Sequence, residues 1–430
     1  MKQIKVLALC LGLLLIFASS SFVLAQDDQA DMIFYNGTIL TIAGDVSEWE
    51  QEALAVQGDE ILAVGSLGDI ESMATSETQW IDLDGRTLMP GIVDPHTHML
   101  NDYGGSLDEA MKFILQNGYT TIGNAYSDES FVRDMVALDA AGGVSVRTTL
   151  YMTANDNCGS VFGNWWADFP PTFDPDDMLR TSGVKIFADG GTCGSPALSY
   201  IDEPPFLSEE LAVDLVQTAD DLGYQVLFHA IGDKAIDVAL QAINAVNGGG
   251  PNTMRHRIDH NAVTRPDQIP LYGAYDIVTV VFASFSFCEA EPTDYTIWEW
   301  RWRDLLATNP GLHMTWHGDW PWVSTANPFE SLYSMVTPFE ISVAGECPTP
   351  AFLTAKQLPV ETVLRMMTSE AAYALFREND VGTLESGKFA DMIVISANPM
   401  AVAPADIKDI DILATYVGGE ALFCTEAFCS

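Results

Sequence analysis

Apolar, β-prone runs alternate with helical stretches between residues 89 and 380. This alternation indicates repeated strand–helix units and a parallel sheet, because parallel neighbours need a crossover that is usually a helix. Eight units in one stretch predict an α/β fold, a closed (β/α)8 TIM barrel. The expected strands cover residues 91–94, 120–124, 147–152, 184–188, 225–229, 257–260, 277–282 and 312–317.

The segments on either side of this region have a different pattern. Residues 32–88 contain short β-prone runs separated by Asn-Gly, Gly-Asp and Asp-Gly turns. Residues 391–395 and 413–417 return to β-prone runs near the C-terminus.

Five amphipathic or helix-favouring stretches lie between the expected strands or after them, at 107–116, 129–141, 209–222, 234–246 and 361–375.

The N-terminus is typical of a secretory signal peptide. Two lysines precede an apolar run over residues 6–17, and a small residue, Ala25, stands before Gln26. An uncleaved membrane anchor is the alternative, but the apolar run is short for a span. We therefore expect residues 1–25 to be removed after Ala25. The mature protein is then expected to be secreted or periplasmic, without a membrane span.

Charge narrows the classes of partner. The chain has 60 acidic and 19 basic residues, for a formal net charge of -41. Nucleic acids and anionic lipid surfaces are disfavoured, because both are bound mainly through lysine and arginine. The acidity favours solubility, with an acidic face that attracts cationic substrates or metal ions as the alternative.

Six cysteines remain after the expected cleavage, and an even number in an exported protein indicates disulfides. Their pairing is open, since six cysteines allow fifteen connectivities. Cys424 with Cys429 could staple the C-terminal tail, while Cys158 and Cys193 both fall in loops expected near the active face. The six are Cys158, Cys193, Cys288, Cys347, Cys424 and Cys429.

The first expected strand ends in a pair of histidines. His96 and His98 are two residues apart, so on an extended chain their rings point the same way and can meet one ion. An isolated His-x-His pair is weak evidence for a metal site. Its position matters more, because the C-terminal ends of barrel strands carry the chemistry in this fold.

Other polar residues occupy the ends of strands five, six and eight and the interior of strand four. Lys185 lies in an apolar strand, where a lysine is unfavourable unless it is paired or modified. His229 and His260 end strands five and six, and Asp319 follows strand eight. Four of only seven histidines thus stand at predicted strand ends, which predicts a metal centre there.

Two further features near strand eight leave alternatives open. His317 is an extra ligand, a substrate contact or a residue that faces away from the site, and we favour the last. Several tryptophans cluster around the same strand and form either packing at the barrel rim, which we favour, or an aromatic wall for substrate. They are Trp298, Trp300, Trp302, Trp316, Trp320 and Trp322.

The motifs resemble those of the amidohydrolase superfamily, in the branch called amidohydrolase family 3, which includes enzymes like N-substituted formamide deformylase. The resemblance covers residues 32 to 425. It implies that residues 89–380 form the barrel and that 32–88 and 381–425 pair into one small β-sandwich domain. The matching segments are LMPGIVDPHTH at 88–98, VKIFADG at 184–190, HAIGD at 229–233, RIDH at 257–260 and VGTLESGKFAD at 381–391.

The resemblance also implies a role for each candidate residue. Two divalent metals are expected, with zinc suited to histidine and carboxylate ligands and manganese, iron or nickel as alternatives. The first metal would be held by His96 and His98, the second by His229 and His260, with carboxylated Lys185 as the bridge and Asp319 touching the first metal and the nucleophilic water.

The implied activity is hydrolysis of a non-peptide C–N bond, of amide or formamide type, in a small-molecule substrate. A metal makes hydroxide available at neutral pH, and Asp319 can pass a proton to the leaving amine. An esterase, lactonase or phosphotriesterase on the same site is the main alternative. A deaminase, disfavoured by Lys185, and a non-catalytic binding protein are further alternatives.

Three departures from the family pattern affect the substrate pocket. Only about twenty residues separate His98 from the next strand, where longer relatives carry a large insertion. Asp259 stands where the family commonly has glutamate, and His317 where it has a small residue. Loops after the strands set specificity, so the identity of the substrate does not follow from the sequence.

Overall fold

The computed structural model describes residues 29–191, 193–284, 296–342, 345–353 and 355–429. The predicted signal peptide and Cys288 lie outside these residues. Within them, none of the helices has the length and apolar character needed to cross a membrane.

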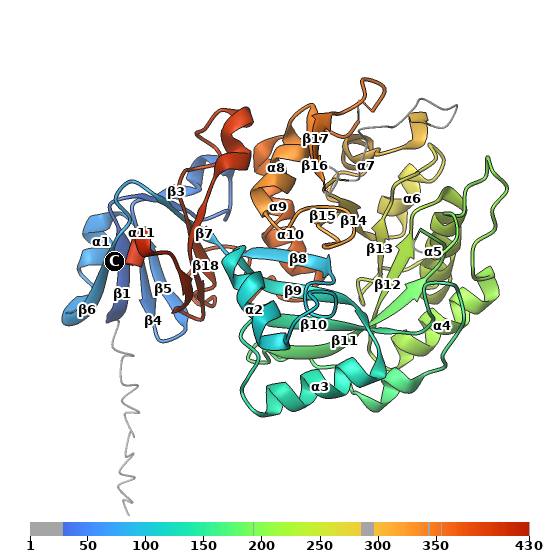
Figure 1. The fold of residues 1–430 in the computed structure, drawn as a ribbon, viewed down its shortest axis with the longest axis horizontal. Helices are drawn as coiled ribbons and strands as arrows, with labels where there is room; N and C mark the ends of the chain where they lie inside the picture. The colour runs from blue at the N-terminus through green and yellow to red at the C-terminus, as the bar shows by residue number, and fades with distance from the viewer. Residues whose placement is uncertain (1–28, 192, 285–295, 343–344, 354, 430) are drawn as a thin grey trace, which may run out of the picture.

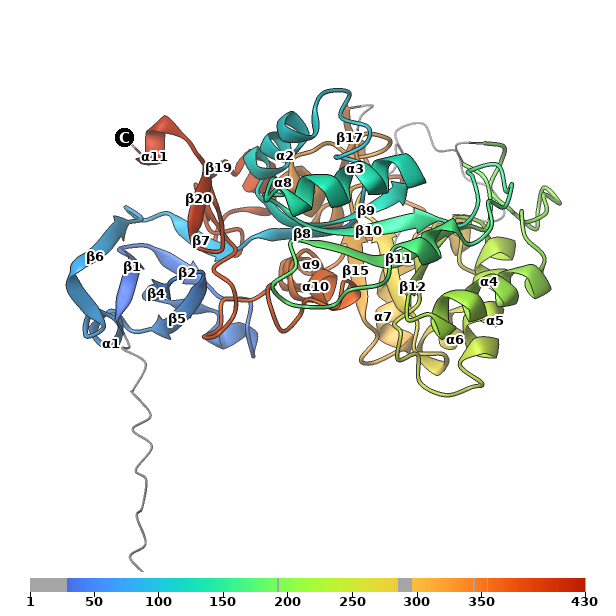
Figure 2. The same ribbon diagram turned by 90° about the horizontal axis from the view of Figure 1, so that it is seen from below.

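Eight parallel strands form the barrel, which confirms the predicted fold (Figures 1 and 2). They are ordered in the sheet as they are along the chain, and the first and last, β8 and β15, lie against one another. The strands are β8 (Ile92–Thr97), β9 (Tyr119–Ser127), β10 (Arg147–Thr153), β11 (Leu179–Phe187), β12 (Gln225–Ala230), β13 (Arg257–His260), β14 (Val278–Phe282) and β15 (Met314–His317).

The register of these strands places the candidate residues at similar depth. His229 is paired with Phe187 on one side and Asp259 on the other, and His317 is paired with Phe282. Almost every strand residue is buried, because the helices cover one face and side chains fill the barrel on the other. Polar side chains at the strand ends are therefore brought together at one end of a packed core.

Helices follow most strands and cover the barrel (Figure 2). Ser106 begins α2 with a reciprocal capping box to Glu109, which sets the end of the short loop after β8. The main helices are α2 (Leu107–Gln116), α3 (Glu129–Ala140), α4 (Glu209–Asp221), α5 (Asp233–Val246), α6 (Ile269–Ala274), α7 (Trp302–Thr308), α8 (Pro328–Val336), α9 (Val360–Met366) and α10 (Ser369–Ala374).

The single helix expected over residues 361–375 is wrong, because the structure divides it into α9 and α10. Thr368 leaves the helical region, with φ -135° and ψ -89°. Its hydroxyl donates a hydrogen bond to the Leu364 carbonyl. The Met367 carbonyl accepts a hydrogen bond from the Val93 amide of β8. The break thus ties this helical segment to the first barrel strand.

Two further β-sheets lie beside the barrel (Figure 1). In the six-stranded sheet, β7 pairs antiparallel with β18, so segments before and after the barrel share one sheet. Its strands are β20 (Glu420–Cys424), β19 (Ile412–Val417), β18 (Met392–Ile395), β7 (Thr87–Pro90), β2 (Thr38–Leu40) and β3 (Glu50–Gln51). The four-stranded sheet contains β5 (Glu60–Gly65), β4 (Ala53–Gln57), β1 (Ala30–Tyr35) and β6 (Ala74–Asp82).

Two disulfides join cysteines that the sequence places at the C-terminal tail and in loops near the active face. Cys424 is bonded to Cys429 at the C-terminal tail. Cys158 is bonded to Cys193, and this bond joins the loop after β10 to the loop after β11. A small hairpin, β16 (Phe339–Ser342) with β17 (Gly345–Pro348), follows α8.

Candidate metal centre

All six predicted site residues line one cavity of about 430 Å³ at the C-terminal end of the barrel strands. His96 lies in β8 and His98 just after it, Lys185 in β11, His229 in β12, His260 in β13, and Asp319 after β15. The structure therefore brings together residues that span more than 220 positions of the chain.

Three donors converge on one side of the cavity. The Oδ1 atom of Asp319 lies 3.2 Å from Nε2 of His98 and 3.4 Å from Nε2 of His96. Each residue is buried, and their donor atoms lie within 4.8 Å of one another. Two imidazoles and a carboxylate in this arrangement can hold a divalent metal.

Two more donors face each other across the cavity. Nδ1 of His229 and Nε2 of His260 are 2.8 Å apart. Nζ of Lys185 lies 3.4 Å from Nε2 of His96, so the lysine adjoins the first donor group. Lys185 is 1% exposed, and a buried amine without a carboxylate at bonding distance is costly unless it is neutral or modified.

The outward nitrogens of the first two histidines each face a carboxylate. Nδ1 of His96 donates to Oδ2 of Asp259 over 2.6 Å. Nδ1 of His98 lies 3.5 Å from Oδ2 of Asp102. A metal-binding histidine usually uses its second nitrogen in this way, which fixes the tautomer and the ring orientation.

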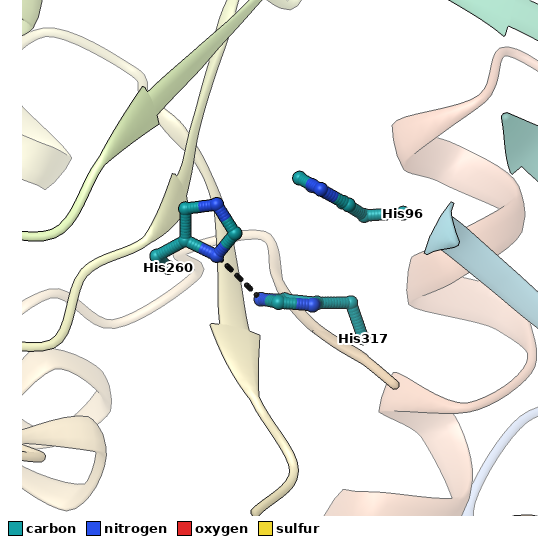
Figure 3. A group of neighbouring side chains, drawn as sticks. All are labelled: His96, His260 and His317. Carbon is teal, nitrogen blue, oxygen red and sulfur yellow. Dashed lines mark hydrogen bonds between the residues drawn. The ribbon is translucent and has the colours of Figure 1, made fainter. Parts of the chain in front are cut away.

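The other two histidines follow the same pattern with neutral partners. Nε2 of His229 donates to the Gly190 carbonyl over 3.2 Å. Nδ1 of His260 lies 3.1 Å from Nε2 of His317 (Figure 3). His96, His229 and His260 thus turn one nitrogen into the cavity and hydrogen-bond the other outside it, which is the usual arrangement of metal-binding histidines. Nδ1 of His98 makes no such hydrogen bond among the described residues.

The expectation that His317 faces away from the site is wrong. Its ring is buried inside the barrel, stacked on His96 at a centroid distance of 4.7 Å, with His260 beside it (Figure 3). His96, His260 and His317 also have donor atoms within 4.8 Å of one another. The residue ends β15, and the inward side of that strand at this depth is the centre of the barrel.

Three residues that support the site were not among the predicted site residues. Asp94 accepts hydrogen bonds from the amides of His96 and Gly318, which ties β8 to the turn after β15. Arg257 donates to the Asp259 carboxylate over 3.1 Å and to the Pro95 carbonyl of β8 over 2.6 Å. The sequence presents Asp259 only as a departure from the family pattern. An aspartate two residues before the His-x-His pair, at the end of an apolar run, was the available signal for Asp94.

Burial sets the protonation of the imidazoles. It lowers the pKa of His229 and of His317 to about 3, and it holds the pKa of His96 and of His260 well below the ordinary range. Neutral imidazole is the form that binds metal. These four histidines are therefore already in ligand form near neutral pH.

The lysine and the aspartate shift in the directions that a metal site needs. Burial lowers the pKa of Lys185 to about 8, which makes the neutral amine accessible. Burial acts to raise the pKa of Asp319, but its contact with His98 and the nearby charges lower it to about 2. Asp319 is therefore an anion, able both to bind a cation and to accept a proton.

Most of the clustered tryptophans pack the barrel, as favoured from the sequence. Trp300, Trp302 and Trp316 are buried in the core, and the half-buried Trp298 and Trp320 pack against it. Trp322 differs, since it is 55% exposed and lines the cavity. One tryptophan of the group therefore belongs to the wall of the site.

The fold and the cavity define a (β/α)8 barrel with a cluster of metal-binding side chains at the strand ends. The chain belongs to the amidohydrolase family, whose family model matches residues 100–423. This confirms the family that the sequence motifs predicted.

Two curated relatives illustrate the similarity. Protein LONG AFTER FAR-RED 3 of Arabidopsis thaliana is 28% identical over 353 residues, covering 74% of this chain and 57% of the relative. N-substituted formamide deformylase of Arthrobacter pascens is 26% identical over 256 residues, covering 56% and 45%. The chain thus spans about half the length of the curated relatives it matches.

A solved structure shares the fold. An uncharacterized metal-dependent hydrolase from Pyrococcus horikoshii OT3 superposes with a TM-score of 0.72 at 17% identity, covering 87% of this chain and 99% of that one.

Proposed function

We propose that this protein is a secreted metal-dependent hydrolase that cleaves a non-peptide C–N bond, of amide or formamide type, in a small molecule. The observation that carries the proposal is the convergence of four histidines on one cavity, three of which hydrogen-bond their outward nitrogen to a neighbouring group. The similarity to N-substituted formamide deformylase supports the bond type.

The residues suit a site for two divalent cations, with zinc the favoured metal. His96, His98 and Asp319 would hold the first, and His229 and His260 the second. Lys185, carboxylated by carbon dioxide, would bridge them, since carboxylation converts a buried cation into an anionic ligand. Bound metals would supply hydroxide near neutral pH and polarise the carbonyl oxygen of the substrate.

Asp319 is the proposed proton carrier. Its carboxylate is ionised, and it stands at the cavity wall next to His98. It would accept a proton from the attacking water and deliver it to the nitrogen of the leaving amine, because C–N cleavage needs a protonated leaving group.

His317 is the proposed positioning residue for His260. Its Nε2 would accept a hydrogen bond from Nδ1–H of His260, which leaves Nε2 of His260 free to bind a cation. Asp259 has the matching role for His96. Direct ligation by His317 is the competing role, because its donor atoms lie close to those of His96 and His260.

Two features support export and a composite domain. The disulfides Cys158–Cys193 and Cys424–Cys429 suit an oxidising compartment, as the N-terminal signal-peptide pattern does. We further propose that residues 32–88 and 381–425 form one small domain beside a barrel of residues 89–380, since β7 and β18 pair in one sheet.

A substrate panel on metal-reconstituted mature protein tests the function. N-formyl and N-acyl amines should be hydrolysed, and matched lactones, esters and phosphotriesters should react more slowly. Protein stripped with a chelator is the control, and it should regain activity when metal is restored. Hydrolysis of lactones or phosphotriesters without hydrolysis of amides would replace the amide proposal with the ester one.

A further inference from the structure

The wall of the cavity beyond the metal donors is largely apolar. Tyr126, Phe187, Ile231, Phe282 and Trp322 contribute to it from five different strands or the loops that follow them. Such a surface favours an aromatic or aliphatic body on the substrate, which would gain by leaving water. The polar residues of the wall then determine which charge the substrate can carry there.

Asp102 is the charged residue among the described lining residues that are not proposed donors. The short loop after β8 holds it in place, since its amide donates to the His98 carbonyl over 2.9 Å. Its carboxylate accepts a hydrogen bond from Nε1 of Trp322 over 3.3 Å. A negative charge therefore sits beside an aromatic ring at the mouth of the cavity.

The loops around the mouth add to this negative charge. The segments after β8, β10, β11 and β15, residues 98–106, 154–169, 188–208 and 318–327, contain seven aspartates and glutamates, Asp319 among them, and no lysine or arginine. The Cys158–Cys193 disulfide joins two of these segments next to Asn157 and Gly191 of the cavity wall.

Two cations that follow neighbouring barrel strands, Lys234 and Arg265, are already paired. Lys234 at the start of α5 lies 3.2 Å from Asp202. Arg265, which follows β13, lies within 3.1 Å of three aspartates, Asp233, Asp237 and Asp267. Neither side chain lines the cavity, so neither offers an unpaired charge to an anionic substrate.

We propose that the site selects substrates by charge: the part of the amide that lies beyond the metal centre is apolar or aromatic and carries a cationic ammonium group, and carboxylates are rejected. A cation there would meet Asp102 and the face of an aromatic ring, whereas a carboxylate would meet Asp102 as a like charge. This inference rests on the proposed function, since it assigns a substrate class to the same cavity.

Three matched formanilides test the inference, with trimethylammonium, tert-butyl or carboxylate at the para position. Their Kd values for the metal-loaded protein would be measured by calorimetry, and their kcat/KM values in parallel. The cationic compound should bind about tenfold more tightly than the carboxylate, with the neutral one between them. The difference should shrink at high salt, because ions screen exposed charges.

A charge-removing variant identifies the residue responsible. Asp102→Asn should reduce the Kd ratio between the cationic and carboxylate compounds about fivefold. Asp134→Asn, which removes an exposed charge on α3, should leave the ratio as in the wild type. The ratio is the readout because any effect of Asp102 on His98 would change both compounds alike.

The outcomes separate the two claims. Equal or tighter binding of the carboxylate compound overturns the charge selection, whatever bond the enzyme cleaves. Tighter binding of the cation without hydrolysis of any formanilide supports the charge selection and counts against the proposed amide cleavage. An unchanged ratio in Asp102→Asn overturns the assignment to Asp102.

Discussion

Asp259→Asn is a sharp test of how the metal ligands are held. The carboxylate of Asp259 accepts the Nδ1 proton of His96 over 2.6 Å, and both residues are buried. Asparagine keeps the size of the side chain but removes its charge, and it can turn its amide NH2 group toward the ring. His96 then loses the partner that fixes its tautomer, so Nε2 is no longer held free for a metal.

Two contacts of Asp259 determine how large the expected losses of metal affinity and of stability are. Loss of such a partner typically lowers metal affinity about 10- to 100-fold, which corresponds to about 1.4 to 2.7 kcal/mol. A second effect comes from Arg257, which lies 3.1 Å from Asp259 and is completely buried. Removing its partner leaves an uncompensated charge, and such changes typically cost about 3–5 kcal/mol of the free energy of unfolding.

The assay is metal competition against a chromophoric chelator, with urea unfolding measured in parallel at a temperature where the variant is folded. Asp134→Asn on the outer face of α3 is the matched control and should bind metal as the wild type does. If folded Asp259→Asn bound metal with unchanged affinity, then His96 either would not depend on Asp259 for its orientation or would not be a ligand.

Three further changes have distinct expected results. His317→Ala should weaken metal binding about tenfold, because His260 loses the acceptor that orients it. His317→Gln can still accept a hydrogen bond from His260, so it should largely restore metal binding. Equal losses in both variants would indicate that His317 is itself a ligand. Asp319→Asn should lower kcat about 10²- to 10⁴-fold on an N-formyl substrate, and near-normal turnover would remove its role as proton carrier. Replacing Cys158 and Cys193 by serine opens a link across 35 positions and should lower the free energy of unfolding by about 4 kcal/mol, measured by urea denaturation against the oxidised wild type.

The barrel was predictable because its strands are buried on both faces and so appear as continuous apolar runs. The start of β11 was not predictable. This strand begins at Leu179, five residues before the expected start at residue 184, and it includes Arg180, which is fully buried. Arg180 donates to the Asp174 and Phe376 carbonyls and pairs with Asp380. Partners that lie up to 200 positions away make a polar segment part of a strand, and local sequence does not contain that information.

The same limit applies to the site. His96, His98 and Asp319 were predictable from their places at strand ends, which the fold brings to one end of the barrel. The inward direction of His317 was not, since the chain turns after β15 and Asp319 has a positive φ of 50°. Alternation along an extended strand does not continue through such a turn. The role of Asp259 depends on a contact with a residue 163 positions away.

The most direct test of the central claim is the number of metal ions bound per chain, with Lys185→Ala measured beside the wild type. Lys185 lies 3.4 Å from Nε2 of His96 at the wall of the cavity, where its carboxylated form would bridge two cations. Elemental analysis of folded, metal-reconstituted mature protein should give two equivalents for the wild type and at most one for Lys185→Ala, with most activity lost. A folded wild type that takes up no metal, or a variant that keeps both ions, would contradict the account.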